Sequence, residues 1–93
     1  MNISEILGSA TAQLVDVRTT MEYDSGHARG AVNIPLDQFA TRYREITELG
    51  TKPVVFYCRS GNRSAQAVAY LRQLGIENIY NGGGLGDIQR YVH

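Results

Sequence analysis

Four short apolar segments along the chain have the length and composition of buried β-strands. They cover residues 13–17 (QLVDV), 31–35 (AVNIP), 53–57 (PVVFY) and 76–80 (IENIY). The segment 53–57 is the most strongly apolar of the four, which is typical of a strand covered on both faces. We therefore expect residues 53–57 to form the central strand of a sheet, ending directly before Cys58.

Between these segments the hydrophobic pattern takes the period of an amphipathic helix. The clearest helix begins near Ser64 and ends at Gly75, with an apolar face made of Ala67, Val68, Leu71 and Leu74. A second helix is predicted from a cap at Asp37 to about Leu49. Shorter helices are predicted over residues 3–8 and from about residue 87, and residues 19–29 are predicted to be a loop.

Strands that alternate with helices at this spacing favour right-handed βαβ units. The expected fold is therefore α/β: a small doubly wound parallel sheet of about five strands with helices on both faces. A chain of 93 residues has room for one core, so residues 1–93 are expected to form a single domain.

The composition narrows the partners and the compartment. Lys+Arg and Asp+Glu are both 9, so no basic surplus is available for nucleic acid, and no apolar run is long enough to predict a membrane span. A single cysteine, Cys58, has no internal disulfide partner and fits a reducing compartment. We expect a cytoplasmic protein that binds neither nucleic acid nor membrane.

Cys58 stands where an open parallel sheet usually binds its ligands, at the carboxyl end of a strand. The next residues are Arg59, Ser60, Gly61, Asn62 and Arg63, and a helix is predicted to start near Ser64. Backbone N–H groups of such an arc, the helix N-terminus and two arginines all favour a thiolate, which is the nucleophilic form of cysteine. The alternative, an inert buried cysteine, does not explain the paired arginines.

This loop resembles the active-site loop of the rhodanese homology domain. Two other stretches are similar to the same family: residues 14–35, with LVDVR, EY and GHARGAVNIP, and the ending NGGGL at 81–85. The resemblance covers nearly the whole chain, from about residue 4 to residue 88. Within the family, the chain is most similar to the small single-domain thiosulfate sulfurtransferases of the phage-shock type.

The resemblance implies a sulfurtransferase with Cys58 as the catalytic residue. Its thiolate would take a sulfane sulfur from a small donor such as thiosulfate and pass it from a persulfide to cyanide or a thiol, including that of a thioredoxin-like protein. Residues 59–64 (Arg59, Ser60, Gly61, Asn62, Arg63 and Ser64) would bind the substrate, with the two arginines favouring a dianion. No cofactor is implied, and no His/Cys/Asp cluster has the spacing of metal ligands.

Two other functions are compatible with the resemblance. A cysteine phosphatase of the same fold needs five residues between its cysteine and arginine, whereas four lie between Cys58 and Arg63. The second alternative is a non-catalytic regulatory module, but such domains usually lack the cysteine. Retention of Cys58 within a cationic loop favours the enzyme.

Three residues outside the loop are predicted to support it. Asp16 ends the first strand and is expected either to orient loop amides or pair with an arginine, or only to cap a turn. Arg18 belongs to the same matching stretch. Glu22 is predicted to pair with Arg63, the alternative being a solvated surface carboxylate. A structural role is expected for His27, since sulfur transfer from a preformed thiolate needs no general base.

Overall fold

The sheet at the centre of the protein is parallel and four-stranded. The structure, a computed structural model, describes residues 3–8 and 12–91. Its strands are β1 (Gln13–Asp16), β2 (Val32–Asn33), β3 (Val54–Cys58) and β4 (Ile79–Gly84), in the spatial order β2-β1-β3-β4. The predicted parallel α/β fold is confirmed. About five strands were expected, but each of the four apolar segments supplies one strand, so the described residues contain four.

Strand β3 lies between β1 and β4 and is buried along its whole length, as its apolar sequence predicts. Val15 of β1 and Asn81 of β4 are the register partners of Phe56. Because hydrogen-bonded neighbours cover both of its edges, β3 holds its last residue, Cys58, in a fixed position at the carboxyl edge of the sheet.

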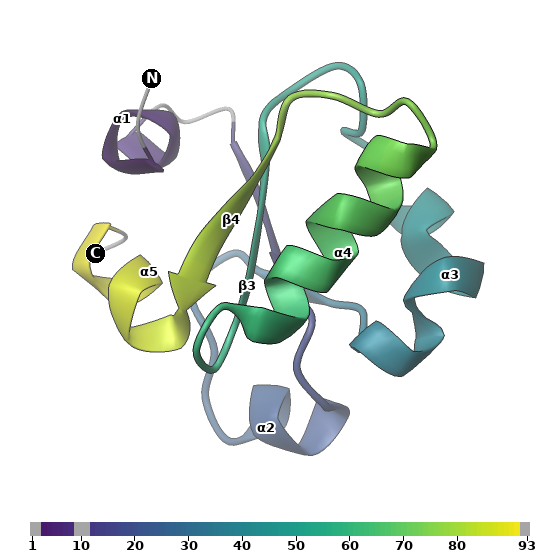
Figure 1. Ribbon diagram of the computed structural model, residues 1–93. Helices are drawn as coiled ribbons and strands as arrows, with labels where there is room; N and C mark the ends of the chain where they lie inside the picture. The colour runs from purple at the N-terminus through teal and green to yellow at the C-terminus, as the bar shows by residue number, and fades with distance from the viewer. Residues whose placement is uncertain (1–2, 9–11, 92–93) are drawn as a thin grey trace.

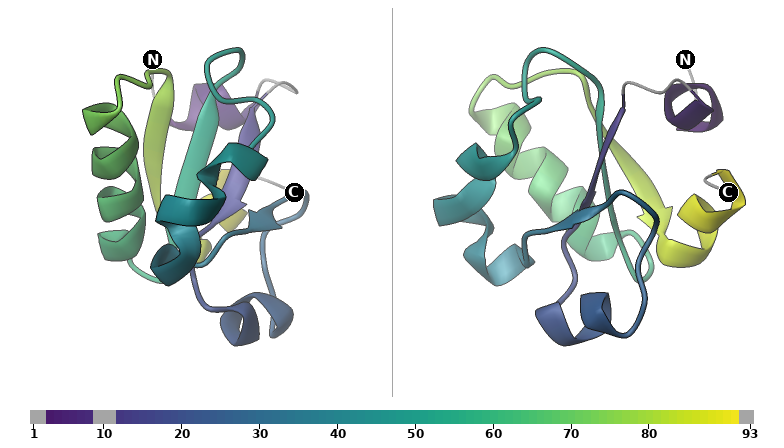
Figure 2. Two further views of the ribbon diagram at one scale, coloured as in Figure 1. Left: turned by 90° about the vertical axis from the view of Figure 1, so that its right-hand side faces the viewer. Right: turned by 180° about the vertical axis from the view of Figure 1, so that it is seen from behind.

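Helices cover both faces of the sheet, as predicted (Figures 1 and 2). On one face, α4 (Asn62–Gln73) and α3 (Phe39–Arg42) enclose a core that includes Val15, Phe56 and Leu71. On the other face, α1 (Ile3–Gly8) and α5 (Leu85–Tyr91) cover Val55 and Tyr57. Among the described residues, no helix is long and apolar enough to span a membrane.

The predicted loop over residues 19–29 contains a helix, so that prediction was wrong. Helix α2 spans Thr20–Asp24 and starts with a capping box. In it, Thr19 accepts a hydrogen bond from the Glu22 backbone, and the Glu22 carboxylate accepts one from the Thr19 backbone. This arrangement fixes the place of Glu22 beside the carboxyl edge of the sheet.

The single helix predicted from Asp37 to Leu49 is broken into three turns. These are η1 (Leu36–Gln38), α3 and η2 (Tyr43–Glu45), and Asp37 lies inside η1 rather than capping a helix. At Ile46 the backbone becomes extended, with φ −78° and ψ 101°, and the side chain enters the core. Burial of Ile46 therefore ends the helical segment before Leu49.

Two element boundaries near Cys58 differ from the predictions. Helix α4 begins at Asn62, two residues before Ser64, because Gly61 acts as its N-cap in the left-handed conformation, with φ 99°. Strand β4 begins at Ile79 and continues through the glycine run to Gly84, with an irregularity that gives it one extra residue opposite β3. As a result, the first turn of α4 and the glycine run of β4 both lie closer to Cys58 than the sequence predicts.

Candidate active site

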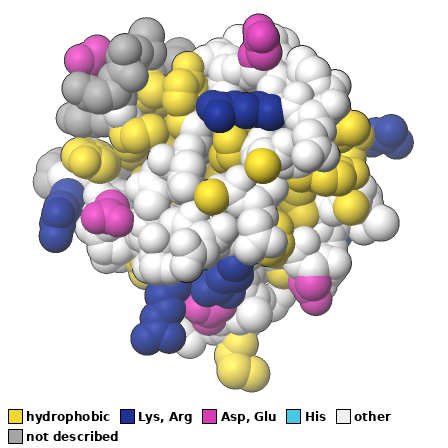
Figure 3. Space-filling model, in the orientation of Figure 1, with side chains coloured by type: hydrophobic (Ala, Val, Ile, Leu, Met, Phe, Trp, Pro, Cys, Tyr) yellow, Lys and Arg dark blue, Asp and Glu magenta, His cyan; other side chains and the backbone are white. Residues whose placement is uncertain are grey.

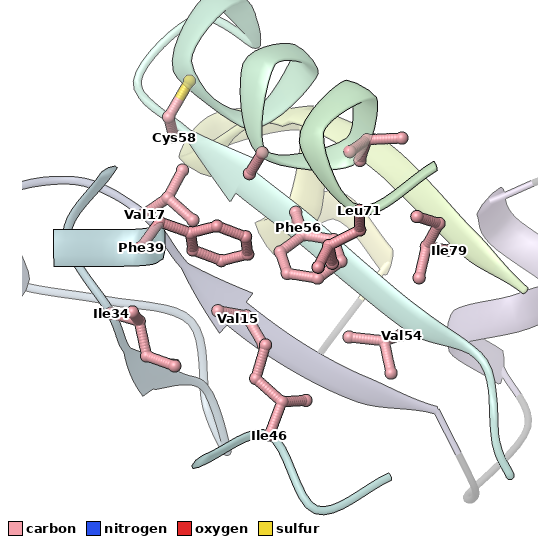
Figure 4. Close-up of a cluster of buried hydrophobic side chains, with 12 residues drawn as sticks. Val15, Val17, Ile34, Phe39, Ile46, Val54, Phe56, Cys58, Leu71 and Ile79 are labelled. Atoms are coloured by element: carbon pink, nitrogen blue, oxygen red, sulfur yellow. The ribbon is translucent and has the colours of Figure 1, made fainter. Parts of the chain in front are cut away.

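Cys58 is the last residue of β3, and its side chain lies on the face of the sheet covered by α4. Figure 4 shows its sulfur directed past the end of the strand toward the first turn of that helix. The residue is 1% exposed and shares a core cluster with Val17 and Phe56. The free thiol is therefore enclosed by the loop that follows it rather than displayed on the surface.

The loop after Cys58 folds back so that its donors point at the sulfur. The Gly61 N–H donates a hydrogen bond to Cys58 Sγ over 2.9 Å, and the Ser64 hydroxyl lies 3.6 Å from the same atom. Gly61 is needed at the turn, because its φ of 99° is a conformation that other residues rarely adopt. A Cβ at this position would also approach the Gly83 Cα to 3.3 Å.

These donors give the sulfur an environment that favours the anion. Burial raises the pKa of the Cys58 thiol, but hydrogen bonds from the Ser64 hydroxyl and from the amides of Ser64, Ser60 and Gly61 outweigh it and lower the pKa to about 7. The sequence assigned much of this effect to Arg59 and Arg63. In the structure the hydrogen bonds of the loop are its main cause.

Arg63 forms the predicted ion pair with Glu22, which joins the start of α4 to α2. Its Nη1 and Nη2 atoms donate to the two carboxylate oxygens over 2.7 and 3.1 Å. The hydrogen bonds from Arg63, followed by that from the Thr19 backbone, hold the pKa of Glu22 at about 2. Figure 3 shows basic and acidic side chains in contact at this end of the molecule. Arg63 is therefore a bridge between elements as well as part of the loop.

Asp16 and Arg18 form a second, buried ion pair at the end of β1. The Arg18 backbone and guanidinium donate to both Asp16 oxygens over 2.7 to 3.0 Å, and Arg18 Nη2 also donates to the Gly26 carbonyl over 2.7 Å. Of the roles predicted for Asp16, the structure shows pairing with an arginine. No hydrogen bond joins Asp16 to the loop amides in the described part of the chain, so the pair supports the neighbouring backbone instead.

Arg59, Ser60 and Asn62 lie on the exposed side of the loop. Within residues 3–8 and 12–91, the Arg59 guanidinium forms no hydrogen bond or ion pair. It borders an open depression of about 420 Å³ that Arg18 and Glu22 also line. Arg59 is therefore positioned to meet an anion approaching this edge of the sheet.

Strand β4 supplies supporting residues that were not assigned roles from the sequence. The Asn81 amide donates to the Gly61 carbonyl over 3.0 Å and accepts from the Ser64 hydroxyl over 2.6 Å and from the Gly83 N–H over 3.0 Å. Gly84 lies directly against the Arg59 carbonyl, and its N–H donates to Asp87 Oδ2 over 2.9 Å. The glycine run was the available signal, but only the fold shows that it faces the loop.

His27 lies in the segment after α2 and packs on Tyr23. Their rings are stacked with centroids 3.7 Å apart, and His27 Nδ1 is 2.9 Å from the Tyr23 carbonyl oxygen. These contacts fit the structural role expected for it. Across the described ranges, no three His, Cys, Asp or Glu side chains are grouped in a way that would hold a metal ion.

Comparison with known proteins finds a matching family model and several similar sequences. A family model described as "Rhodanese-like domain" matches residues 2–88. The thiosulfate sulfurtransferase PspE of Escherichia coli (strain K12) is 35% identical over 79 residues, which are 85% of this chain and 76% of that protein. YqhL of Bacillus subtilis (strain 168), described as uncharacterized, is 46% identical over 74 residues, 80% of this chain and 57% of that protein.

Similar sequences also occur inside longer proteins. A tRNA uridine(34) hydroxylase of Photorhabdus laumondii is 30% identical over 83 residues, which cover 85% of this chain but 24% of the hydroxylase. Among solved structures, one described as "rhodanese with anions from E. coli" superposes with a TM-score of 0.75 at 34% identity, covering 82% of this chain and 89% of that one.

Proposed function

Because the chain belongs to the family of rhodanese-like domains, we propose that it is a sulfurtransferase that carries a sulfane sulfur as a persulfide on Cys58. The observation that carries the proposal is the convergence of loop donors on a single buried sulfur, with the Gly61 amide 2.9 Å away. These donors favour a thiolate near neutral pH and remain available to an outer sulfur attached to it.

The proposed reaction has two displacement steps. In the first, the Cys58 thiolate attacks the outer sulfur of a donor such as thiosulfate, the S–S bond of the donor breaks, and sulfite leaves with its electron pair. In the second, cyanide or a thiolate attacks the outer sulfur of the persulfide, and the electron pair of that S–S bond returns to Cys58. Splitting one transfer into two steps is covalent catalysis, and no electrons are gained or lost overall.

The proposed substrates follow from the charges around the loop. Among the residues that the structure describes, Arg59 has no ion-pair partner, and its cation at the exposed side of the loop favours a dianionic donor. The acceptor is a small nucleophile such as cyanide or a thiol, including that of a thioredoxin-like protein. Since its lone thiol needs reducing conditions to stay free, we place this activity in the cytoplasm.

The geometry supports sulfur transfer better than phosphate hydrolysis. Four residues separate Cys58 from Arg63, one fewer than a cysteine phosphatase of this fold needs. Both terminal nitrogens of Arg63 are also bound to Glu22, so its guanidinium is held in the wall of the site rather than directed at a bound oxyanion. A tetrahedral phosphate would therefore lack the arginine contacts on which such enzymes depend.

Intact-mass measurement tests the proposal. After incubation with thiosulfate the protein should gain the mass of one sulfur atom, and it should lose that mass when cyanide is added. Cys58→Ser is the control, because an alcohol forms no persulfide while the small change leaves the fold intact. An unchanged mass of the folded wild-type protein, or the same gain in the serine variant, would refute the proposal.

A further inference from the structure

The hydroxyl of Ser64 has three acceptors within reach but only one proton. Its Oγ lies 2.6 Å from Asn81 Oδ1, 3.1 Å from the Gly61 carbonyl and 3.6 Å from Cys58 Sγ. A hydroxyl donates one hydrogen bond at a time. Whichever acceptor holds the Ser64 proton therefore withholds it from the other two, and the shortest of these contacts is the one to Asn81.

The orientation of the Asn81 amide follows from its other neighbours. The Gly83 N–H is only a donor, so the Asn81 atom 3.0 Å from it must be the oxygen. The Gly61 carbonyl is only an acceptor, so the atom 3.0 Å from it must be the NH₂ nitrogen. An amide oxygen cannot donate, so Ser64 must donate across the 2.6 Å contact. In this arrangement Ser64 presents a lone pair, not a proton, toward the sulfur.

We infer that Asn81 is a positioning residue that holds the Ser64 hydroxyl proton while Cys58 is a thiol and releases it to the sulfur when the sulfur becomes an anion. The thiol can donate its own proton to the Ser64 oxygen, so the neutral site is a chain from Cys58 through Ser64 to Asn81. When the thiolate forms, the Ser64 proton turns to the sulfur. Asn81 therefore stabilises the thiol relative to the thiolate and opposes part of the lowering of the Cys58 pKa.

The backbone of β4 fixes Asn81 for this role. Asn81 is the register partner of Phe56, so both side chains lie on the face of the sheet that α4 covers. Beyond it, β4 has one extra residue opposite β3, and Gly83 adopts φ 88° there. This local turn directs the Gly83 N–H back to the Asn81 oxygen, so that oxygen is held by a backbone donor as well as by Ser64.

Charged side chains lie on several of the elements around the loop. Arg63 of α4 is paired with Glu22 of α2, Arg18 is paired with Asp16 at the end of β1, and Arg59 follows Cys58 in the loop. On the remaining side, Asp87 of α5 accepts from the Gly84 N–H. In the described part of the chain, none of these six side chains hydrogen-bonds to Ser64 or Asn81. A change at Asn81 can therefore be read separately from these charges.

The inference uses the proposed function only in treating Cys58 as the nucleophile, and its test measures ionisation rather than sulfur transfer. Alkylation by iodoacetamide, which is uncharged, is followed against pH in the wild type, Asn81→Leu, Ser64→Ala and the double variant. Leucine has nearly the shape of asparagine but no acceptor. We expect Asn81→Leu to lower the alkylation midpoint by about 0.5 to 1 pH unit, because the Ser64 proton is then free to turn to the sulfur. Ser64→Ala should raise it.

The double variant separates this role from simple anchoring of the loop. If Asn81 acts through Ser64, Asn81→Leu should leave the midpoint unchanged in the Ser64→Ala background. An equal shift in both backgrounds, or a raised midpoint for Asn81→Leu alone, would overturn the inference. Failure here is distinguishable from failure of the proposed function, because the mass of the wild-type protein is also measured after incubation with thiosulfate. A wild type that gains one sulfur, together with midpoints that do not follow the expected pattern, would refute this inference and leave the proposed function standing.

Asn81→Asp gives a second test that does not depend on the leucine variant folding. Its carboxylate keeps the shape of the amide and holds the Ser64 proton more firmly, but it also adds a negative charge that raises the midpoint directly. We expect a rise in the wild-type background and a smaller rise in the Ser64→Ala background. Rises of the same size in both backgrounds would show that only the charge matters and would overturn the inference.

Discussion

Gly84 allows the loop after Cys58 to pack closely against β4, and a substitution of Gly84 tests how that loop is supported. A Cβ added to Gly84 would lie 3.0 Å from the carbonyl carbon of Arg59 and closer still to its oxygen. Both atoms are backbone, so no side chain can rotate away. The φ of Gly84 lies outside the left-handed region, so Gly84→Ala tests this close approach without adding backbone strain.

The size of the effect follows from the distances. An ordinary contact between such carbon atoms is about 3.5 to 4.0 Å, so Arg59 and β4 must separate by about 0.5 to 1 Å. Arg59 follows Cys58 directly, and the displacement would carry the amides that point at the sulfur. A misplacement of about 1 Å at reacting groups costs about a hundredfold in rate. Overpacking of this kind also lowers the free energy of unfolding by about 1 to 3 kcal/mol.

The assay compares Gly84→Ala with Gly86→Ala, a control two residues further along the chain. A Cβ at Gly86 meets no atom within 4 Å, and alanine suits its position in α5 better than glycine does. We expect kcat/KM for transfer from thiosulfate to cyanide to fall about a hundredfold for Gly84→Ala and to stay at the wild-type value for Gly86→Ala. Wild-type kinetics in a folded Gly84→Ala protein would refute the claim that β4 positions the loop.

Three further predictions concern charge. The pKa of the Cys58 thiol is lowered from 9.0 to about 7, so its alkylation rate should rise with pH and level off above about 7; a midpoint near 9 would contradict this. The lowered pKa also adds to the free energy of unfolding of the wild type relative to Cys58→Ser, and this contribution should be present above pH 9 and lost as pH falls through 7. Arg59→Ala should raise KM for thiosulfate about tenfold and leave the alkylation midpoint nearly unchanged. Arg63→Ala should lower kcat as well as raise KM, and Glu22→Gln should also lower kcat, because each substitution removes the ion pair between Arg63 and Glu22 that joins α4 to α2. An unchanged kcat in both variants would argue that this ion pair does not position the loop.

The strands and the helix after Cys58 could be predicted because their signals are local. A strand such as 53–57 is recognised from its own composition, and the helix from Ser64 to Gly75 from its own period. The segment 37–49 has the same kind of period, yet it breaks at Ile46, because burying that side chain in the core requires extended backbone. Tertiary packing decided this boundary, and a single sequence carries no record of it.

In the candidate site too, the features with a local sequence signal could be predicted and those set by tertiary packing could not. The loop from Cys58 to Ser64 is contiguous, so its motif was visible, and the pairing of Arg63 with Glu22 was predicted from charge across 41 positions. The contacts of Asn81 with this loop were not predicted. Asn81 lies 17 residues after Ser64, and only the turn of β4 at Gly83 brings its amide to the hydroxyl. Such a contact depends on a backbone irregularity that composition does not reveal.

The ion pairs of the structure change which residue is expected to select the donor. From the sequence, both Arg59 and Arg63 were expected to attract a dianion, and Arg63 was also expected to pair with Glu22. In the structure Arg63 is neutralised by Glu22, as Arg18 is by Asp16. Within the described residues, Arg59 is left as the unpaired cation at this edge. We therefore expect Arg59 to bind the charged donor and Arg63 to act by holding the loop in position. Arg59→Ala should then mainly raise KM, whereas Arg63→Ala should also lower kcat.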